Sequence, residues 1–217
     1  MSRKSASERR GEILAATIEE IEATGLRTLR VADVAARLGL SPSLVIYHFV
    51  TKEALVAAAF AHAGENDLCR ARRLAASRKP ARERLRDVVG WYMPSGSTRS
   101  WKIWIDGWSA GLFDEELRST FTNLDREWKA ILAGLIVEGV EGVDGGANGE
   151  ASVAVDEVVD SAREAIEADA ESAAESAATR ILAYLDGLAI QALINPEAVS
   201  RSVLNGWVDD FLANELG

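Results

Sequence analysis

Cysteine and histidine are scarce in this chain, and their scarcity narrows the chemistry that it can carry. Cys69 is the only cysteine, so an internal disulfide and a cysteine-rich metal framework are excluded. His48 and His62 are the only histidines, so a metal site would consist mostly of carboxylates. We therefore expect no metal and no cofactor.

Long apolar runs are also missing near the N-terminus. The opening stretch "MSRKSASERR" is basic, but no unbroken apolar run of about 7 to 15 residues follows it, as a secretory signal would require. The 217 residues are 48% hydrophobic, which is enough for a substantial core. The sequence predicts a soluble cytoplasmic protein without a membrane span.

Strand signals are absent as well, because no segment shows the apolar and polar alternation that is typical of hairpins. Leucine, alanine and charged residues recur at helical spacing, and the four prolines fall where helices should begin or end. We expect an all-α protein with helices over residues 7–24, 31–38, 42–49, 52–77, 81–93, 99–110, 114–139, 179–193 and 199–214.

Negative charge dominates the composition but not the N-terminal part. The formal net charge is -10, and residues 138–176 alone hold twelve acidic residues against one arginine. Residues 1–55 hold eight Lys and Arg against seven Asp and Glu, so the acidity does not argue against nucleic-acid binding there. Residues 141–177 contain little bulky apolar surface, and we expect a flexible acidic insertion with a frayed helix around 155–178.

The stretch "RLGLSPS" joins two of the short predicted helices, and this arrangement is typical of a helix-turn-helix. Gly39 lies in the turn. Ser41 can accept a hydrogen bond from the first amides of the second helix, and Pro42 suits the first helical position. A hairpin in the core of a helical protein gives the same pattern, so both interpretations stay open.

The second of these helices has two different faces. Val45 and Phe49 are four residues apart and can face inward together. The outer face can make three kinds of contact with DNA. A hydroxyl can bond a phosphate, and an imidazole can bond a phosphate or a base edge. An isoleucine can touch the methyl group of a thymine. Lys52 adds positive charge to the amides that begin the next helix, which suits a phosphate. The residues left for the outer face are Ser43, Ile46, Tyr47 and His48.

Residues 25–55, "GLRTLRVADVAARLGLSPSLVIYHFVTKEAL", resemble the DNA-binding region of the TetR family of regulators. The resemblance rests on Gly before the second helix, Val-Ala within it, Gly-Leu-Ser at the turn, Tyr-His-Phe closing the third helix, and Lys-Glu with Leu opening the fourth. It implies an N-terminal three-helix DNA-binding unit. Within this unit, Tyr47 and Lys52 would bind phosphates, and Ser43 and His48 would also lie at the DNA.

Two positions depart from the family pattern. Arg30 stands where many members have a Thr or Ser that caps the second helix and meets a phosphate, so Thr28 or Arg30 must take over that role. Ile46 stands where many members have tyrosine, which favours an apolar base contact at that position. The predicted DNA-binding residues are Thr28, Arg30, Ser41, Pro42, Ser43, Ile46, Tyr47, His48 and Lys52.

Structural interpretations also remain open for individual residues. His48 can be a satisfied core histidine, and Tyr47 can be a packing residue whose hydroxyl bonds the backbone. The basic residues of "MSRKSASERR" form either a solubilising end or an arm that reaches a flanking phosphate or the minor groove.

Tryptophan is concentrated beyond the DNA-binding region. Trp101, Trp104 and Trp108 recur at spacings of three and four, so they share one face of a helix. This stripe is either core packing or the lining of a ligand pocket, where the indole faces could hold a cation. The predicted ligand-binding residues are Trp101, Trp104, Ile105, Trp108, Phe121 and Trp128.

Residues 99–214 resemble the C-terminal domain of the choline-operon repressor (BetI-like) branch of that family. The stretches that carry this resemblance are "WKIWIDGWSAGLFDEELRSTFTNLDREWKAILAGLIVEGVEG" and "ILAYLDGLAIQALINPEAVSRSVLNGWVDDFL". They imply an effector-binding domain and a homodimer, without identifying the effector. The last two helices favour a dimer independently, because apolar residues from Ile181 to Leu193 cover more than one side. A dimer would place two recognition helices about 34–36 Å apart, on successive major-groove faces.

The sequence thus predicts a ligand-responsive repressor that binds a palindromic operator as a homodimer and responds to a small-molecule effector. We expect residues 1–50 to form the DNA-binding domain and residues 51–217 the helical ligand-binding and dimerisation domain. An enzyme is a weaker hypothesis, because His62, Glu65 and Cys69 share a helix face but no HExxH, paired Glu-x-x-His or Gly-rich phosphate loop accompanies them. A helical scaffold that lacks DNA binding is the third hypothesis.

Overall fold

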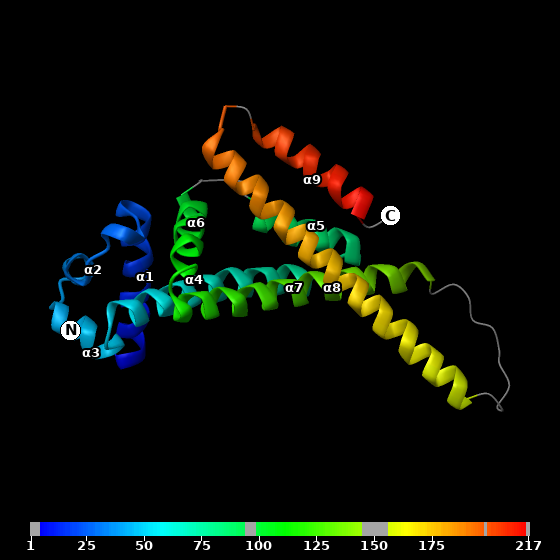
Figure 1. The fold of residues 1–217 in the computed structure, drawn as a ribbon, viewed down its shortest axis with the longest axis horizontal. Coiled ribbons are helices and arrows are strands. Elements are labelled where there is room, and N and C mark those ends of the chain that lie inside the picture. The colour runs from blue at the N-terminus through cyan, green and yellow to red at the C-terminus, as the bar shows by residue number, and fades with distance from the viewer. Residues whose placement is uncertain (1–4, 94–98, 145–155, 198, 216–217) are drawn as a thin grey trace. The chain divides into compact units, whose positions relative to one another are not determined.

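The computed structural model describes residues 5–93, 99–144, 156–197 and 199–215, with side chains for all of these except 99–100 and 141–167. Those residues form nine α-helices and one 3-10 helix and contain no strand, which confirms the predicted all-α fold. The elements in Figure 1 are α1 (Ala6–Thr24), η1 (Leu26–Thr28), α2 (Val31–Arg37), α3 (Pro42–Phe49), α4 (Lys52–Ala75), α5 (Ala81–Tyr92), α6 (Arg99–Gly111), α7 (Glu115–Asp144), α8 (Asp156–Ile194) and α9 (Arg201–Glu215).

The first helix shows how local signals set its two ends. The Ser5 hydroxyl accepts a hydrogen bond from the backbone N–H of Glu8 at 3.1 Å, and the Glu8 carboxylate accepts one from the backbone N–H of Ser5 at 2.7 Å. This capping box satisfies two amides that have no partner within the helix. α1 ends at Gly25, whose φ of 85° is a conformation that glycine adopts without strain. Its ψ of 153° leads the chain directly into η1, which the sequence did not predict.

Helix α8 differs most from the sequence-based expectation. The composition predicted a flexible insertion over 141–177 with a frayed helix around 155–178, and a separate helix from residue 179. In the structure α7 extends to Asp144, and one helix, α8, begins at Asp156. Residues 145–155 lie outside the described part of the chain. Alanine and glutamate are strong helix formers, so a shortage of bulky apolar residues does not prevent a helix. Ala174, Ala177 and Ala178 are buried, which extends the packed part of α8 towards its N-terminus.

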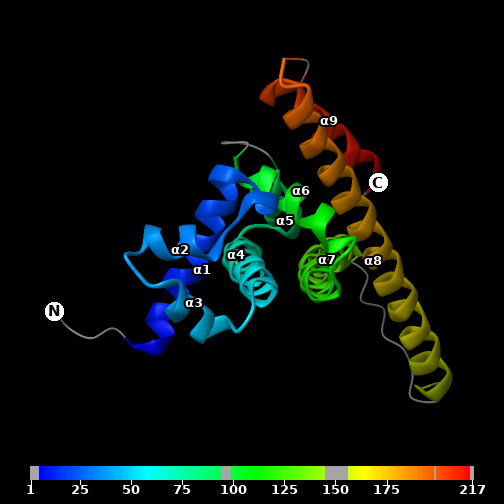
Figure 2. The ribbon, with the colours of Figure 1, turned by 60° about the vertical axis from the view of Figure 1, so that its left-hand side comes forward.

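The backbone contacts divide the chain into two compact units. Unit 1 comprises Met1–Cys69 and Gly96–Arg126, and unit 2 comprises Arg70–Ser95 and Glu127–Gly217. In unit 1, α1, α2 and α3 gather around the first part of α4, as Figure 2 shows. The core that joins them also includes residues of α6 and α7. The buried residues of this core include Ile13, Ile21, Val34, Val45, Phe49, Leu55, Phe60, Ile103 and Leu117.

Unit 2 is held together by aromatic and polar contacts between its helices. The Tyr92 hydroxyl of α5 donates a hydrogen bond to Asp186 Oδ1 of α8 at 2.7 Å. The Tyr92 ring meets Trp128 of α7 edge-on, with 4.8 Å between ring centroids. Tyr184 of α8 and Phe211 of α9 stack at 4.1 Å, which ties α9 along α8 (Figures 1 and 2). These contacts connect four helices across three stretches of the chain.

Part of α8 also passes a length and composition test for a membrane span. Among the described residues, Ala168–Ile194 is the one single helical segment that does so, and α3 and α4 pass only when taken together across a bend of 72°. Core helices of soluble proteins commonly pass the same test, and 44% of the most apolar part of Ala168–Ile194 is buried inside the structure. This finding is therefore weak support for a membrane span.

Candidate functional site

Helix α3 begins as its sequence predicts. The Ser41 hydroxyl accepts a hydrogen bond from the backbone N–H of Leu44 at 3.3 Å, and Pro42 occupies the first turn. Val45 and Phe49 are buried in the core of unit 1. Gly39, in the turn before α3, has a φ of 65°, which explains the need for glycine there. The predicted helix-turn-helix is therefore present, with its second helix anchored through one face.

The opposite face of α3 is open to solvent. Tyr47 is 80% exposed and Ile46 is 37% exposed, so the interpretation of Tyr47 as a buried packing residue is wrong. Ser43 is also exposed. His48 is half-buried and meets the Tyr47 ring edge-on at 5.5 Å, so it is not a fully buried core histidine. The four residues predicted for the outer face are thus all accessible, and their contact with DNA stays a prediction.

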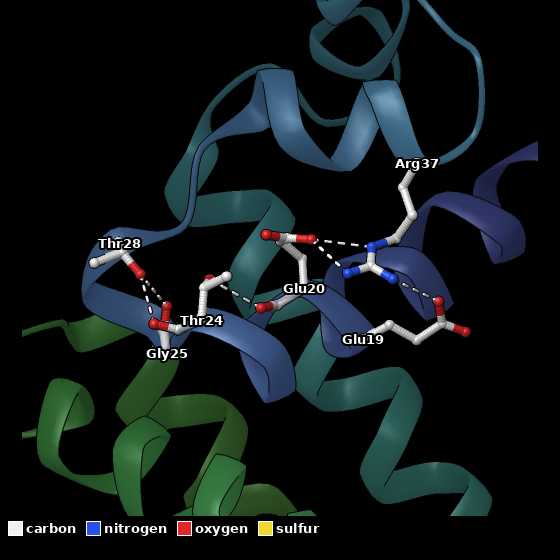
Figure 3. Close-up of polar contacts among 6 residues, drawn as sticks. All are labelled: Glu19, Glu20, Thr24, Gly25, Thr28 and Arg37. Atoms are coloured by element: carbon white, nitrogen blue, oxygen red, sulfur yellow. Dashed lines mark hydrogen bonds and ion pairs between the residues drawn. The ribbon is translucent and has the colours of Figure 1, made fainter.

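An ion-pair cluster fixes α2 against α1, as Figure 3 shows. Nε and Nη2 of Arg37 both donate to Oε2 of Glu20, at 3.0 Å and 2.7 Å. Glu19 adds a longer contact to Nη1 of Arg37 at 3.5 Å. The hydrogen bonds that Arg37 donates to the Glu20 carboxylate raise the pKa of Arg37 above its ordinary value. Because α2 packs in turn against α3, this cluster helps to set the orientation of α3 in unit 1.

A second contact ties α3 to α1 directly. The Arg10 guanidinium lies 4.3 Å from the centre of the Phe49 ring, in cation–π geometry. Arg9 pairs with Glu12 at 2.8 Å. The basic residues Arg9 and Arg10 therefore belong to α1, whereas Arg3 and Lys4 of the predicted arm lie outside the described residues.

The start of α2 differs from the prediction. We expected Thr28 or Arg30 to cap this helix, but Arg30 occupies the cap position without a side-chain hydrogen bond. The Thr28 hydroxyl donates to the carbonyl oxygens of Thr24 at 2.6 Å and Gly25 at 3.2 Å (Figure 3). Thr28 lies in η1, so its hydroxyl reaches the last carbonyls of α1 instead of the amides of α2. The predicted cap is therefore wrong, and a phosphate contact of either residue stays a prediction.

Lys52 is the first residue of α4 and is half-buried. The Thr51 hydroxyl accepts a hydrogen bond from the backbone N–H of Ala54 at 3.0 Å, so it caps this helix. Lys52 therefore belongs to the first turn of a long helix, where the unpaired amides favour an anion.

The tryptophan stripe of α6 separates into two groups within unit 1. Trp104 packs against Phe60 of α4 and Phe121 of α7, with ring centroids 5.6 Å and 6.3 Å apart. Trp101 and Trp108 meet each other edge-on at 6.0 Å. Trp101 is buried, whereas Trp104, Ile105, Trp108 and Phe121 are half-buried. Most of the stripe is therefore packed, and its partly exposed members remain accessible to a ligand.

Trp128 does not join these residues. It belongs to unit 2, where it packs against Tyr92. Gly107 explains why α6 can approach α4 and α7 closely, because a Cβ atom there would lie 2.6 Å from Phe60 and 2.7 Å from Phe121. The structure thus brings together five of the six predicted ligand-binding residues in one unit and leaves Trp128 in the other.

Asp106 connects α6 to the segment before the helix-turn-helix, and the sequence did not predict this contact. Its Oδ2 atom accepts a hydrogen bond from the backbone N–H of Leu26 at 2.5 Å, and α6 also contacts α1. The carboxylate thus connects the tryptophan helix to η1, the segment that precedes the helix-turn-helix. Asp106 and Leu26 are eighty residues apart in sequence. No local pattern indicates such a pair.

Asp67 is a second residue that the sequence reasoning missed, although the apolar pattern of α4 does indicate it. The apolar positions of α4 recur as Phe60, Leu68 and Ala71, all buried, with Gly64 between them. Asp67 follows Phe60 by two helical turns and so interrupts this stripe with a carboxyl group. It is half-buried, and its burial raises the pKa of the carboxyl to about 6.

The residues proposed for a metal-dependent enzyme do not form a metal site. Within the described ranges, no group of three or more His, Cys, Asp or Glu side chains could hold a metal ion. His62 is half-buried on α4, whereas Glu65 and Cys69 are exposed.

Two family models match the chain. The model of bacterial regulatory proteins, tetR family, matches residues 13–59, which span α3 and its neighbours. The model of the BetI-type transcriptional repressor, C-terminal, matches residues 81–155 and 145–217.

Curated relatives include the HTH-type transcriptional regulator BetI from Burkholderia cenocepacia and that from Paraburkholderia xenovorans. Each is 33% identical over 114 residues, which cover 51% of this chain and 58% of the relative. The chain therefore spans little more than half the length of the curated relatives that it matches.

Solved structures share the fold over nearly the whole chain. A putative transcriptional regulator from Saccharomonospora viridis in complex with choline has a TM-score of 0.73 and 23% identity, and covers 95% of this chain and 96% of its own. A putative transcriptional regulator from Pseudomonas aeruginosa PAO1 has a TM-score of 0.72 and 21% identity, and covers 99% of this chain and 94% of its own. Because the BetI-type model alone matches more than half of the residues, and the tetR model covers the helix-turn-helix, the chain belongs to the tetR family of bacterial regulatory proteins.

Proposed function

We propose that this protein is a transcriptional repressor that binds a palindromic operator as a homodimer and releases it when a small-molecule effector binds. The observation that carries the proposal is the two-faced helix α3, which is anchored through Val45 and Phe49 and exposes Ile46 and Tyr47. Exposed apolar and aromatic side chains on a short, well-fixed helix suit a major groove better than they suit water. Family membership supports the same function.

Contacts with the operator divide into two kinds. Tyr47 and Lys52 bind phosphates, which sets the position of α3 on the duplex without reading its sequence. Ser43, Ile46 and His48 face base edges, where a hydroxyl, a methyl-bearing side chain and an imidazole can distinguish base pairs. Thr28, Arg30, Ser41 and Pro42 flank this surface and contact the backbone of the duplex.

The homodimer forms through α8 and α9. Ile194, Val203 and Trp207 are exposed apolar residues on or next to these helices, and they need a partner surface. A second copy of the same two helices would cover them and complete a four-helix interface. Analytical ultracentrifugation of the wild type and of Trp207→Glu tests this, because a charge at the centre of the interface should shift the protein towards monomer.

The effector is an organic cation that binds beside the half-buried aromatic residues Trp104, Trp108 and Phe121. Aromatic faces attract cations. Choline, the ligand of the Saccharomonospora viridis regulator of the same fold, is the first compound to test. Binding there would shift α6 and strain the Asp106 hydrogen bond to Leu26, which would change the orientation of the helix-turn-helix.

Fluorescence anisotropy with labelled duplex DNA tests the function. The duplex is the intergenic DNA beside the protein's own gene, with a scrambled duplex of equal length as control. We expect the affinity for the intergenic duplex to be higher and to fall steeply with salt, since phosphate binding releases counterions. Added choline should weaken the binding. Equal, salt-insensitive binding to both duplexes would exclude a sequence-reading repressor.

We infer from the same function that the protein works in the cytoplasm, where operator DNA is found, and that it carries out no catalysis.

A further inference from the structure

Val50, the residue that follows α3, has an unusual backbone conformation. Its φ is 68° and its ψ is -53°, and the Phe49 carbonyl accepts a hydrogen bond from the backbone N–H of Thr51 at 2.7 Å. Together these define a γ-turn with positive φ at its central residue, a rare and strained form. Within the described residues, Val50 is the single non-glycine residue with positive φ. A side chain branched at Cβ is especially unfavourable in this conformation.

Folding gives no reason for a valine at this position. The side chain is 77% exposed, so it contributes little to any core. Glycine would adopt the same φ without strain, and asparagine would adopt it more readily than valine. Strained residues that persist without a packing role tend to lie at functional sites.

The position of Val50 indicates what it contacts. It lies three residues after Tyr47 and two residues before Lys52, the two side chains proposed to bind phosphates. Its side chain is exposed, as are those of Ile46 and Tyr47 in the last turns of α3. Val50 lies beyond the end of α3, between the two residues proposed to bind phosphates, which places it nearer the backbone of the duplex than the base edges. The apolar part of that backbone is the deoxyribose.

We propose that Val50 packs against a deoxyribose of the operator, between the phosphates that Tyr47 and Lys52 bind, and so positions α3 on the duplex. The inference rests on the proposed DNA-binding function. It assigns to Val50 a contact that is apolar and therefore insensitive to salt. The contact is also independent of base sequence, since every nucleotide carries the same sugar.

Two variants test the proposal, with an operator selected by the wild-type protein from a random DNA pool. Val50→Gly removes the apolar group and the strain, whereas Val50→Thr keeps the branched shape and the strain but replaces a methyl with a hydroxyl. We expect Val50→Thr to bind the operator about fourfold more weakly, the loss that follows from about one buried methylene group, and Val50→Gly to bind at least as weakly because it removes more of the side chain. The loss should be the same for every operator sequence tested. The Tm of Val50→Gly should stay unchanged or rise by about 2 °C, because strain is relieved.

Salt dependence separates this contact from an ionic one. The slope of log K against log salt should stay unchanged in both Val50 variants, whereas Lys52→Gln should reduce its magnitude by about 1. This matched comparison distinguishes an apolar contact from a phosphate contact at positions two residues apart.

Each other outcome overturns a different statement. If the wild type binds no DNA, the proposed function and this inference both fail. If the wild type binds tightly and both variants bind equally well, the inference alone fails. Weak binding by Val50→Gly with normal binding by Val50→Thr would assign the effect to a loosened turn. A loss that disappears when one thymine is replaced by uracil would assign the contact to a thymine methyl instead of a sugar.

Discussion

Helices α3 and α6 both carry aromatic and apolar residues at helical spacing, and they use them in opposite ways. On α3, Tyr47 is 80% exposed, while on α6, Trp101 is 7% exposed. The inward positions of α3 are already filled by Val45 and Phe49, so its other large side chains must face water or a partner. On α6, Trp104 packs against the rings of α4 and α7, and Trp101 and Trp108 pack against each other. How far the side chains are buried, and not their residue types, therefore distinguishes a surface that can contact DNA from a packed core.

This comparison predicts two classes of mutant within the same compact unit. A substitution in the packed group should lower the free energy of unfolding and leave the DNA affinity of the folded protein unchanged. A substitution on the exposed face of α3 should lower the affinity and leave the stability unchanged. Partly exposed residues test how much exposure is needed before a substitution affects DNA affinity instead of stability.

The largest expected effect is that of Phe60→Ala. Phe60 is fully buried and contacts the rings of Trp104 and Phe121, so its truncation leaves a cavity that rigid aromatic neighbours cannot fill. We expect a loss of about 3–5 kcal/mol in the free energy of unfolding, measured by urea denaturation with tryptophan fluorescence. Phe113→Ala is the matched control, because Phe113 is 91% exposed and the change should stay within about 0.5 kcal/mol. Equal losses for both variants would show that the aromatic cluster does not hold unit 1 together.

Asp67 gives the next largest effect, which depends on pH. Because its pKa is raised from 3.8 to about 6 in the folded state, the folded state binds more protons than the unfolded state between these values. The stability that this group contributes is therefore present at low pH and is lost as pH rises through about 6. Asp67→Asn removes the ionisation, so its stability relative to wild type should increase by about 1.5 kcal/mol from pH 5 to pH 7.5.

Urea denaturation of both proteins at the two pH values measures this difference. Asp87→Asn would not serve as a control, because Asp87 forms an ion pair with Lys79. Asp210→Asn is better, because Asp210 is exposed and shows no comparable burial. A stability difference between Asp67→Asn and wild type that does not change with pH would show that the carboxyl group is solvated in the folded state.

The sequence was sufficient to predict the architecture around α3. Ser41, Pro42 and Gly39 act through the few residues next to them, and the alternation of Val45 and Phe49 with exposed neighbours follows directly from helical spacing. The same reasoning failed at the start of α2, because the direction of the Thr28 hydroxyl depends on η1, a turn without a strong local signal.

Contacts between residues that are far apart in the sequence could not be predicted either. The hydrogen bond between Asp106 and Leu26 depends on how two distant segments pack, and helical periodicity contains no information about it. The separation of Trp128 from the α6 stripe has the same origin. The strain at Val50 depends on the exact geometry of a turn between two helices, whereas its residue type alone indicates an ordinary apolar position.

Tyr47→Phe tests the exposed face of α3 by removing a single oxygen atom. It removes the hydroxyl and keeps the ring, so we expect about fivefold weaker binding to all operator sequences, the loss of about one hydrogen bond. The Tm should not change, because the side chain is largely exposed. Tyr92→Phe makes the same chemical change in unit 2, where the hydroxyl bonds Asp186, and should lower the Tm by about 2–4 °C without affecting DNA binding. A change in both DNA affinity and Tm in either variant would contradict this separation of binding from stability.

Ile46→Ala is expected to have the smallest effect on affinity and the largest effect on preference. Ile46 is 37% exposed, so it lies at the border between the packed and the exposed class, and part of its side chain supports α3. We expect about threefold weaker binding to the preferred operator, with little loss on operators in which one thymine is replaced by uracil, because the methyl partner is already absent. Anisotropy titrations with a set of singly substituted duplexes measure this, and Ile46→Val serves as a control that keeps most of the contact. A uniform loss over all duplexes would assign Ile46 to the DNA backbone, as proposed for Val50. A fall in Tm as large as that of Phe60→Ala would assign it to the core, and the outer face of α3 would then read sequence only through Ser43 and His48.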